Sequence, residues 1–173
     1  MSEAAAASRV QVAWALLAGV PDPELPVLSV RDLGIVRDVV DGDDALEVVL
    51  TPTYSGCPAT EFIAASVRHA LEQGGLGPVR VTQRLAPAWT TDWISAEGRR
   101  KLREYGIAPP SGAAAAADDT WPVVFHPRTP PAVPCPRCDS ARTERLSAFG
   151  STACKAMYRC LACREPFEHF KPI

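Results

Sequence analysis

Two Cys-x-x-Cys pairs near the C-terminal end constrain the fold of this chain more than any other feature. They stand in the segments CPRC and CLAC, with 21 residues (139 to 159) between them, and comprise Cys135, Cys138, Cys160 and Cys163. Each such pair turns the backbone so that two thiolates face one point, and two pairs supply the four sulfurs that a structural zinc ion prefers. The spacing therefore predicts a closed metal site that acts as scaffold rather than catalyst.

Residues 135–173 are too few to bury enough apolar surface to fold alone, so bound metal would supply most of their stability. Residues 143–149, 156–159 and 166–170 have strand character. We expect their aromatic residues to form a small core, namely Phe149, Tyr158, Phe167 and Phe170. This is the layout of a zinc ribbon. Ligand type alone does not separate zinc from iron, so an iron ion or an iron–sulfur cluster stays an alternative at this site.

Composition and charge restrict the function classes. The chain has 173 residues, 47% hydrophobic and 22% charged, which suits one domain with a small appendix. The net charge is -2, so bulk attraction to nucleic acid is not expected. Residues 135–173 contain seven Lys/Arg against four Asp/Glu, and four metal-bound thiolates would offset most of that excess. We therefore expect no nucleic-acid partner.

The N-terminal segment MSEAAAASRVQVAWALLAGV lacks the basic region of a signal peptide. No stretch approaches the roughly 18 uninterrupted apolar residues that a membrane span needs, so no membrane association is expected. Metal-spaced thiols without a secretion signal are typical of a reducing compartment. The sequence thus predicts a cytoplasmic protein.

The first part of the chain shows alternating helix and strand patterns. Val10, Ala13, Trp14 and Leu17 form one apolar helical stripe. Residues 35–40 and 46–50 are β-branched runs separated by an Asp-Gly turn, which predicts a hairpin. A second helix is expected over 58–73 and a third strand over 79–85. The last helix is expected to begin after Ser95 and to run to Tyr105.

This order of helix, hairpin, helix, strand and helix predicts an α+β domain over residues 1–106, with helices covering a small sheet. Residues 107–134 contain seven of the 17 prolines and a run of alanines, which indicates a linker that serves as a spacer or a hinge. Residues 135–173 complete the chain as the ribbon.

Cys57 lies between a predicted strand and a predicted helix, directly before Pro58. Proline favours the first helical position, so Cys57 would be the N-cap, where backbone amides and the helix dipole lower the pKa of a thiol. Such a thiolate could bind metal or attack an electrophile. The alternative is a small apolar residue packed under the loop. Cys154 has no Cys-x-x-Cys partner, and we interpret it as a buried residue, with a spare metal ligand as the alternative.

Two further groups could carry function. Asp22 and Glu24, in PDPELP, could orient a metal, or they could brace a proline-stiffened turn. A basic stretch follows Trp89 and Trp93 and comprises Arg99, Arg100, Lys101 and Arg103. It could grip an acidic partner or a phosphate-bearing ligand such as coenzyme A, although a solvated helix face beside buried tryptophans is the alternative.

Several of these segments together resemble a known family. PDPELPVLSVRDLGIVRDV, TPTYSGCPATE, APAWTTDWISAEGRRKLREYGIAPP and FGSTACKAMYRCLACREPFEHFKPI are similar to the PaaD (PaaJ) family of the bacterial phenylacetyl-CoA epoxidase system. Residues 8–105 resemble the wider SufT-type family of iron–sulfur assembly factors. The ribbon is the feature that distinguishes the PaaD-like members.

The resemblance implies an accessory role in phenylacetate catabolism, where a multicomponent oxygenase epoxidises the ring of phenylacetyl-CoA. It implies help in maturing a metal centre, with the iron–sulfur flavin reductase as the main partner. The sequence does not decide between a monomer and a homodimer. In this interpretation Cys57 is a transient iron or cluster ligand, Asp22 assists it, and the zinc ribbon docks a partner. The alternatives are a structural or regulatory subunit that transfers no metal, and an enzyme with Cys57 as nucleophile, which lacks a recognisable general base.

Overall fold

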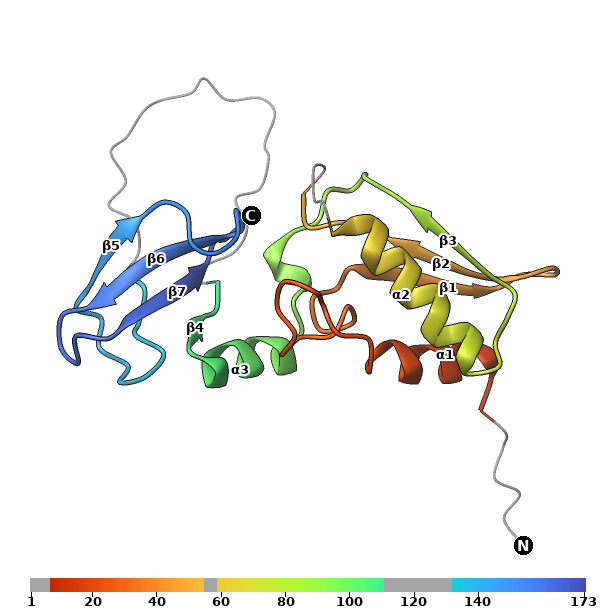
Figure 1. Ribbon diagram of the computed structural model, residues 1–173, viewed down its shortest axis with the longest axis horizontal. Coiled ribbons are helices and arrows are strands. Elements are labelled where there is room, and N and C mark those ends of the chain that lie inside the picture. The colour runs from red at the N-terminus through yellow and green to blue at the C-terminus, as the bar shows by residue number, and fades with distance from the viewer. Residues whose placement is uncertain (1–6, 55–58, 111–131) are drawn as a thin grey trace, which may run out of the picture. The chain divides into compact units, whose positions relative to one another are not determined.

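The computed structural model describes residues 7–54, 59–110 and 132–173, and the chain divides into two compact units (Figure 1). The N-terminal unit comprises Met1–Trp89 and Trp93–Gly98, and the C-terminal unit comprises Thr90–Asp92 and Arg99–Ile173. The elements in chain order are α1 (Arg9–Leu17), β1 (Val36–Asp41), β2 (Leu46–Leu50), α2 (Thr60–Gln73), β3 (Val79–Gln83), the 3-10 helix η1 (Thr91–Trp93), α3 (Ala96–Tyr105), β4 (Ile107–Ala108), β5 (Thr143–Ser147), β6 (Lys155–Cys160) and β7 (Pro166–Phe170).

The N-terminal unit is built on a three-stranded sheet in the order β1-β2-β3. β1 and β2 form the expected antiparallel hairpin, with Asp41 opposite Leu46. β3 runs parallel to β2, with Val79 opposite Leu46, so α2 is the crossover between them. The α+β fold class predicted from the sequence is confirmed.

Helices α1 and α2 cover this sheet because their apolar stripes pack against its buried side chains, which alternate along the central strand β2 (Figure 1). The hydroxyl of Ser8 accepts a hydrogen bond from the Gln11 backbone and begins α1 with a capping box. The residues that form the interior are Ala13 and Leu17 of α1, Leu46, Val48 and Leu50 of β2, and Ile63, Val67 and Leu71 of α2. Burying each large aliphatic side chain contributes about 1.5–3 kcal/mol, so this core can hold without metal.

Asp32 is the main polar anchor inside the N-terminal unit. One carboxylate oxygen accepts hydrogen bonds from the backbone N–H (3.1 Å) and hydroxyl (2.9 Å) of Ser29, and the other accepts from the Ser95 hydroxyl (3.2 Å). The Asp32 carbonyl also accepts the Ser95 backbone N–H at 2.9 Å. Gly34 follows at φ 67, where a Cβ atom would lie 2.5 Å from the Trp93 carbonyl oxygen, so only glycine fits. These contacts fix the position of the chain where α3 begins.

The beginning and end of α3 match the sequence prediction. The Ser95 hydroxyl accepts the Gly98 backbone N–H at 2.9 Å, as an N-cap does. The helix ends before Gly106, which adopts φ 91. Within the described residues no helix combines the length and apolarity that crossing a membrane requires.

The C-terminal unit contains a four-stranded sheet in the order β4-β7-β6-β5. β4 is parallel to β7, with Ile107 opposite Glu168, whereas β5, β6 and β7 are antiparallel. Ile107, Ala108 and Val133 are buried in this unit, although the sequence analysis placed them in a linker over 107–134. Backbone pairing with β7 explains the difference, because two apolar residues are too few to show a strand pattern. Residues 111–131 lie outside the described residues.

One residue of the expected aromatic core lies elsewhere. Phe149 is 65% exposed, because β5 already ends at Ser147 and Phe149 follows it in a loop. Its ring lies under the Lys171 ammonium group, 4.7 Å from the ring centroid. Phe167 and Phe170 are buried as expected. The small core cluster comprises Ala108, Val133, Cys135, Cys160 and Phe167, with the partly buried Tyr158 packed against it.

Candidate metal centre

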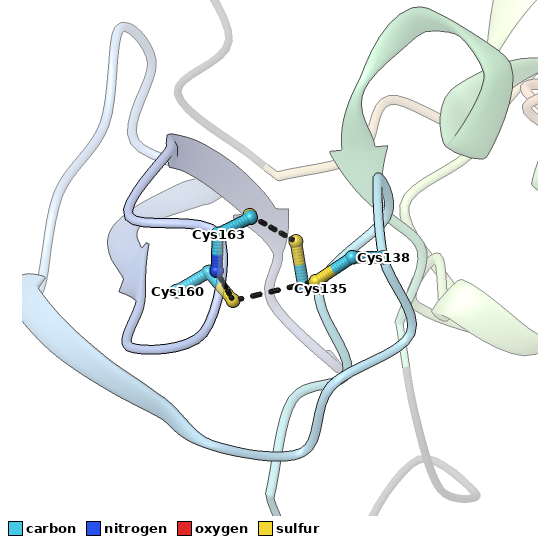
Figure 2. Close-up of side chains that lie close together, drawn as sticks. All are labelled: Cys135, Cys138, Cys160 and Cys163. Atoms are coloured by element: carbon cyan, nitrogen blue, oxygen red, sulfur yellow. Dashed lines mark hydrogen bonds between the residues drawn. The ribbon is translucent and has the colours of Figure 1, made fainter.

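The four cysteines of the two Cys-x-x-Cys pairs converge on one point in the C-terminal unit (Figure 2). Their sulfur atoms all lie within 4.8 Å of one another. The Cys135 and Cys163 sulfurs are 3.8 Å apart, and the Cys138 and Cys160 sulfurs are 3.6 Å apart. A tetrahedral site with Zn–S bonds of about 2.3 Å requires sulfur separations of about 3.8 Å. The thiols thus fit a tetrahedral four-sulfur metal site.

The backbone of each pair is a tight turn closed by its own hydrogen bonds. In the first turn the Asp139 N–H donates to the Cys135 carbonyl at 2.9 Å. In the second the Cys160 N–H donates to the Glu165 carbonyl at 3.0 Å. The residue after each second cysteine is left-handed, with φ 59 at Asp139 and φ 66 at Arg164. The same local geometry therefore presents two sulfurs from each turn.

The two turns come from different places in the sheet, which lets them face each other. The first precedes β5, and the second begins at Cys160, the last residue of β6. The Leu161 N–H donates to the Arg142 carbonyl at 2.8 Å and ties the second turn to the start of β5. Cys135 and Cys160 are fully buried, whereas Cys138 and Cys163 are exposed. The cluster therefore lies at the edge of the unit's small core.

The thiols strongly influence one another's ionisation. Hydrogen bonding from the Cys163 backbone N–H, 3.5 Å from the sulfur, is the main cause that lowers the pKa of Cys160 to about 6. The Glu165 backbone lowers the pKa of Cys163, but burial and the neighbouring thiols outweigh it and raise that pKa to about 12. Four thiolates this close cannot all ionise unless a cation compensates their charge, which is what a bound divalent metal does.

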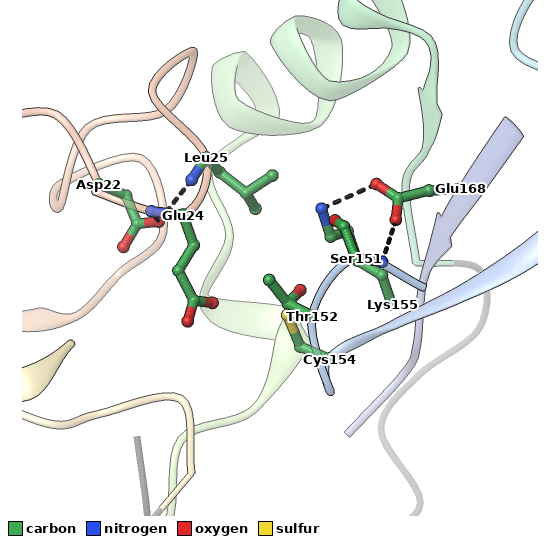
Figure 3. Close-up of polar contacts among 8 residues, drawn as sticks. All are labelled: Asp22, Glu24, Leu25, Ser151, Thr152, Cys154, Lys155 and Glu168. Atoms are coloured by element: carbon green, nitrogen blue, oxygen red, sulfur yellow. Dashed lines mark hydrogen bonds and ion pairs between the residues drawn. The ribbon is translucent and has the colours of Figure 1, made fainter. Parts of the chain in front are cut away.

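Asp22 and Glu24 lie in the loop after α1, and for Asp22 the structure shows the bracing role that was one of the two interpretations (Figure 3). Asp22 is buried, and one of its carboxylate oxygens accepts the backbone N–H of Glu24 at 3.0 Å and that of Leu25 at 2.8 Å. These bonds form a local turn that holds the proline-rich segment. The predicted assisting role toward a metal stays a prediction.

Cys57 lies outside the described residues, so its predicted role as a metal or cluster ligand stays a prediction. The prediction that it is the N-cap of the second helix is wrong. α2 begins at Thr60 with Ala59 as its N-cap, and no side chain caps that end. Proline at position 58 favoured an earlier start, but a propensity defines a helix end only to within one or two residues.

The arginines of α3 make mainly structural contacts. Arg99 donates to the carbonyls of Thr91 (2.8 Å) and Pro110 (2.9 Å). Arg100 pairs with Glu104, and Arg103 pairs with Asp139 beside the first turn. These contacts weaken the interpretation of α3 as a phosphate grip.

Trp89 and Cys154 are buried, whereas Trp93 is only half-buried and lies under the Arg37 guanidinium, 3.5 Å from its ring centroid. Trp89 is 3% exposed and its indole donates to the Leu33 carbonyl at 2.9 Å. Cys154 is buried as predicted, and its sulfur lies 3.0 Å from the Thr152 hydroxyl. Neither residue belongs to the four-sulfur cluster.

Sequence reasoning missed a second set of charged contacts in the C-terminal unit. Lys155 is buried, and its ammonium group lies 2.8 Å from the Glu168 carboxylate, which also accepts the Ser151 backbone N–H (Figure 3). Burial alone would raise the pKa of Glu168, but these bonds lower it below its usual range. The pair could have been suspected only from the register of β6 against β7, which a single sequence does not reveal.

Two segments of the chain match known families. Residues 119–171 match the PaaD zinc beta ribbon domain, and residues 11–82 match the iron–sulfur cluster assembly protein family. The two matched segments coincide with the ribbon and with most of the N-terminal unit.

Individual proteins agree with these matches. A protein of Escherichia coli (strain K12), named as one of the components of 1,2-phenylacetyl-CoA epoxidase, is 50% identical over 165 residues, covering 95% of this chain and 94% of its own. A protein of Porphyromonas gingivalis named Fe-S protein maturation auxiliary factor is 37% identical over 89 residues, covering 50% of this chain and 84% of its own. The crystal structure of a domain of unknown function, DUF59, from Bacillus anthracis shares 27% identity with a TM-score of 0.51, covering 54% of this chain and 91% of that chain.

Proposed function

Because the chain belongs to the PaaD family of phenylacetyl-CoA epoxidase subunits, we propose that it is an accessory component of that epoxidase system which helps to mature an iron–sulfur centre of its partners. The observation that carries this proposal is the joining of two matched segments in one chain. One segment belongs to an iron–sulfur assembly family and the other to the PaaD zinc ribbon. The relative from Porphyromonas gingivalis, named as a maturation factor, matches about half of this chain.

In this proposal the two parts of the chain have different roles. In the C-terminal unit, a zinc ion held by the four clustered thiolates stabilises the ribbon and takes no part in chemistry, because four protein ligands leave no open position. In the N-terminal segment, Cys57 binds iron or a cluster transiently, as cargo rather than as a resident cofactor. Support comes from α2, whose N-terminal end carries no side-chain cap, and which begins three residues after Cys57. The positive end of a helix dipole stabilises a nearby thiolate.

The client in this proposal is the iron–sulfur flavin reductase or the oxygenase of the same system. The test is to express these components with the wild-type chain, without it, or with Cys57→Ser. Iron and acid-labile sulfide are then measured in the purified reductase and oxygenase. We expect loss of most cluster content from one client when the chain is absent, and a similar loss with Cys57→Ser.

Cys154→Ser is the matched control, since it removes the other cysteine outside the cluster. It should leave the cofactor content of the clients unchanged. Equal iron and sulfide with and without the chain would overturn the maturation role. Full cofactor content with Cys57→Ser, together with loss of epoxidase activity when the whole chain is missing, would instead identify a structural or regulatory subunit.

A further inference from the structure

The second Cys-x-x-Cys turn borders a basic cavity that the proposed function does not use. The cavity measures about 380 Å³ and is lined by Arg142, Arg159, Cys160, Leu161 and Arg164. Its three arginines come from the start of β5, the end of β6 and the turn between β6 and β7. They are thus brought together by the same register that assembles the metal centre. We call this the arginine cavity.

One of the three arginines in the arginine cavity already pairs with a carboxylate, and the other two do not. The guanidinium of Arg159 pairs with the Glu144 carboxylate across the β5–β6 ladder, with Nε 2.9 Å from Oε1. Within the described residues the guanidinium groups of Arg142 and Arg164 make no hydrogen bond or ion pair. Both of these side chains are exposed. Two cations are therefore open to a ligand, next to a third that already pairs with a carboxylate, the partner for which a guanidinium is best suited.

Leu161 adds an apolar contact among these charges. It is 43% exposed, and its backbone is held by the hydrogen bond to the Arg142 carbonyl. An exposed leucine on a rigid turn gives a phosphate-like ion nothing to bind. It does suit a ligand that carries apolar and acidic groups on one flexible chain, as a protein segment does.

We propose that the arginine cavity docks an acidic segment of a partner protein, with carboxylates on Arg142 and Arg164 and an apolar side chain against Leu161. Cys160 lines the same cavity, and a divalent metal with four thiolates carries a net charge of -2. This negative charge repels a compact polyanion such as pyrophosphate more strongly than it repels a peptide, because the carboxylates of a peptide are spaced along the chain. The proposal does not depend on Cys57 and holds whether or not the chain matures a cluster.

The experiment uses the full-length, zinc-loaded chain and a fluorescein-labelled peptide of three glutamates, one leucine and three glutamates, with binding followed by anisotropy at low salt. We expect the double charge reversal Arg142→Glu with Arg164→Glu to weaken binding by about tenfold or more, a factor of ten being 1.4 kcal/mol. Leu161→Ser should weaken it by about threefold while leaving the salt dependence unchanged.

Arg145→Glu is the matched control. Arg145 is an exposed arginine on β5 beside Glu144, and it points to the other face of the strand, outside the cavity. This reversal should change binding by less than about twofold. Zinc content is measured for every variant. If charge reversal displaces the metal, the milder pair Arg142→Gln with Arg164→Gln is tested instead.

Three results would overturn the proposal. The first is equal weakening by Arg145→Glu, which would indicate general attraction to net charge. The second is displacement of the peptide by inorganic pyrophosphate or a single-stranded oligonucleotide at concentrations well below those of unlabelled peptide. The third is a loss of zinc affinity in the glutamine variants with peptide binding unchanged, which would make the arginines counter-charges of the metal centre alone.

Discussion

The two units of this chain reach stability by different means. The N-terminal unit buries apolar side chains of α1, β2 and α2 against one another. The buried carboxylate of Asp32 accepts hydrogen bonds from donors within the same unit. The cluster beside the metal centre comprises five buried residues, two of which are themselves metal-site cysteines. One unit is thus held by apolar packing and the other by a group that the chain must acquire.

This difference bears on how a maturation factor can carry metal. A scaffold whose integrity depends on a tightly held ion is ill suited to release that ion, since release would unfold the scaffold. A unit that folds on its own apolar core can bind and release cargo without losing its structure. Transient metal chemistry therefore suits the N-terminal segment, and a fixed metal suits the ribbon.

The largest expected effect is the loss of the ribbon when its metal site is broken. Cys135→Ser removes a fully buried ligand, and metal binding contributes about 10–16 kcal/mol to structural zinc domains. We expect β4 to β7 to lose amide protection, whereas β1 to β3 keep it. Hydrogen exchange with mass spectrometry measures both units in one sample.

Cys154→Ser is the control for this experiment, because it alters a buried thiol of the same unit outside the cluster. It should retain one metal ion per chain and full protection of β6. If Cys135→Ser instead abolishes protection in both units together, the two are one cooperative domain and the contrast between them fails.

A substitution in the N-terminal unit should have a smaller effect on stability and should leave the metal site intact. Asp32→Ala removes a buried carboxylate that accepts three hydrogen bonds, and losing bonds to a charged acceptor costs about 3 kcal/mol. Denaturant unfolding followed by exchange in β1 to β3 should report this loss. Zinc content should stay at the wild-type value. Asp43→Ala, an exposed position in the β1–β2 turn, should change stability by less than about 0.5 kcal/mol.

How far the sequence predicted this molecule depends on whether a contact is local. The stripe of α1 and the hairpin are signals within one element or one turn, and these predictions were confirmed. The Cys-x-x-Cys spacing is local in the same way, and the four thiols that it singled out do converge. The Ser95 bond to Asp32, 63 residues away, and the assembly of the arginine cavity depend on tertiary register, which leaves no periodic trace in a single sequence. The error at Phe149 has the same origin, since strand propensity continues past the point where β5 stops.

The stability of the ribbon should also depend on pH through a buried histidine. His169 is buried in β7, its Nε2 has no hydrogen-bond partner among the described residues, and burial lowers its pKa to about 4 from the usual 6.5. Between these values the unfolded chain binds a proton that the folded chain does not, so ribbon stability falls as pH falls from 6.5 toward 4. The slope from this group is at most about 1.4 kcal/mol per pH unit.

His169→Phe should flatten that slope, because phenylalanine cannot titrate and can still pack edge-on against Tyr158 as the imidazole does. The measurement is the free energy of ribbon unfolding at fixed excess zinc from pH 7 to 4.5, taken as wild type minus variant. The difference cancels thiolate protonation, which both proteins share. A pH-independent difference would mean that His169 has the same pKa in the folded ribbon as in the unfolded chain, so that burial does not lower it.

The smallest expected effect separates stability from docking within the ribbon. Arg164 adopts φ 66, a left-handed conformation that costs a residue with a side chain about 1–2 kcal/mol and glycine almost nothing. Arg164→Gly should therefore stabilise the zinc-loaded ribbon by about 0.5–1 kcal/mol, after the extra entropy of glycine in the unfolded chain is subtracted. The same change removes one of the two open cations of the arginine cavity, so acidic-peptide binding should weaken while stability rises. Parallel denaturant and anisotropy titrations of this variant test both signs at once. A variant that loses stability and binding together would show that Arg164 supports the fold of the turn rather than a partner.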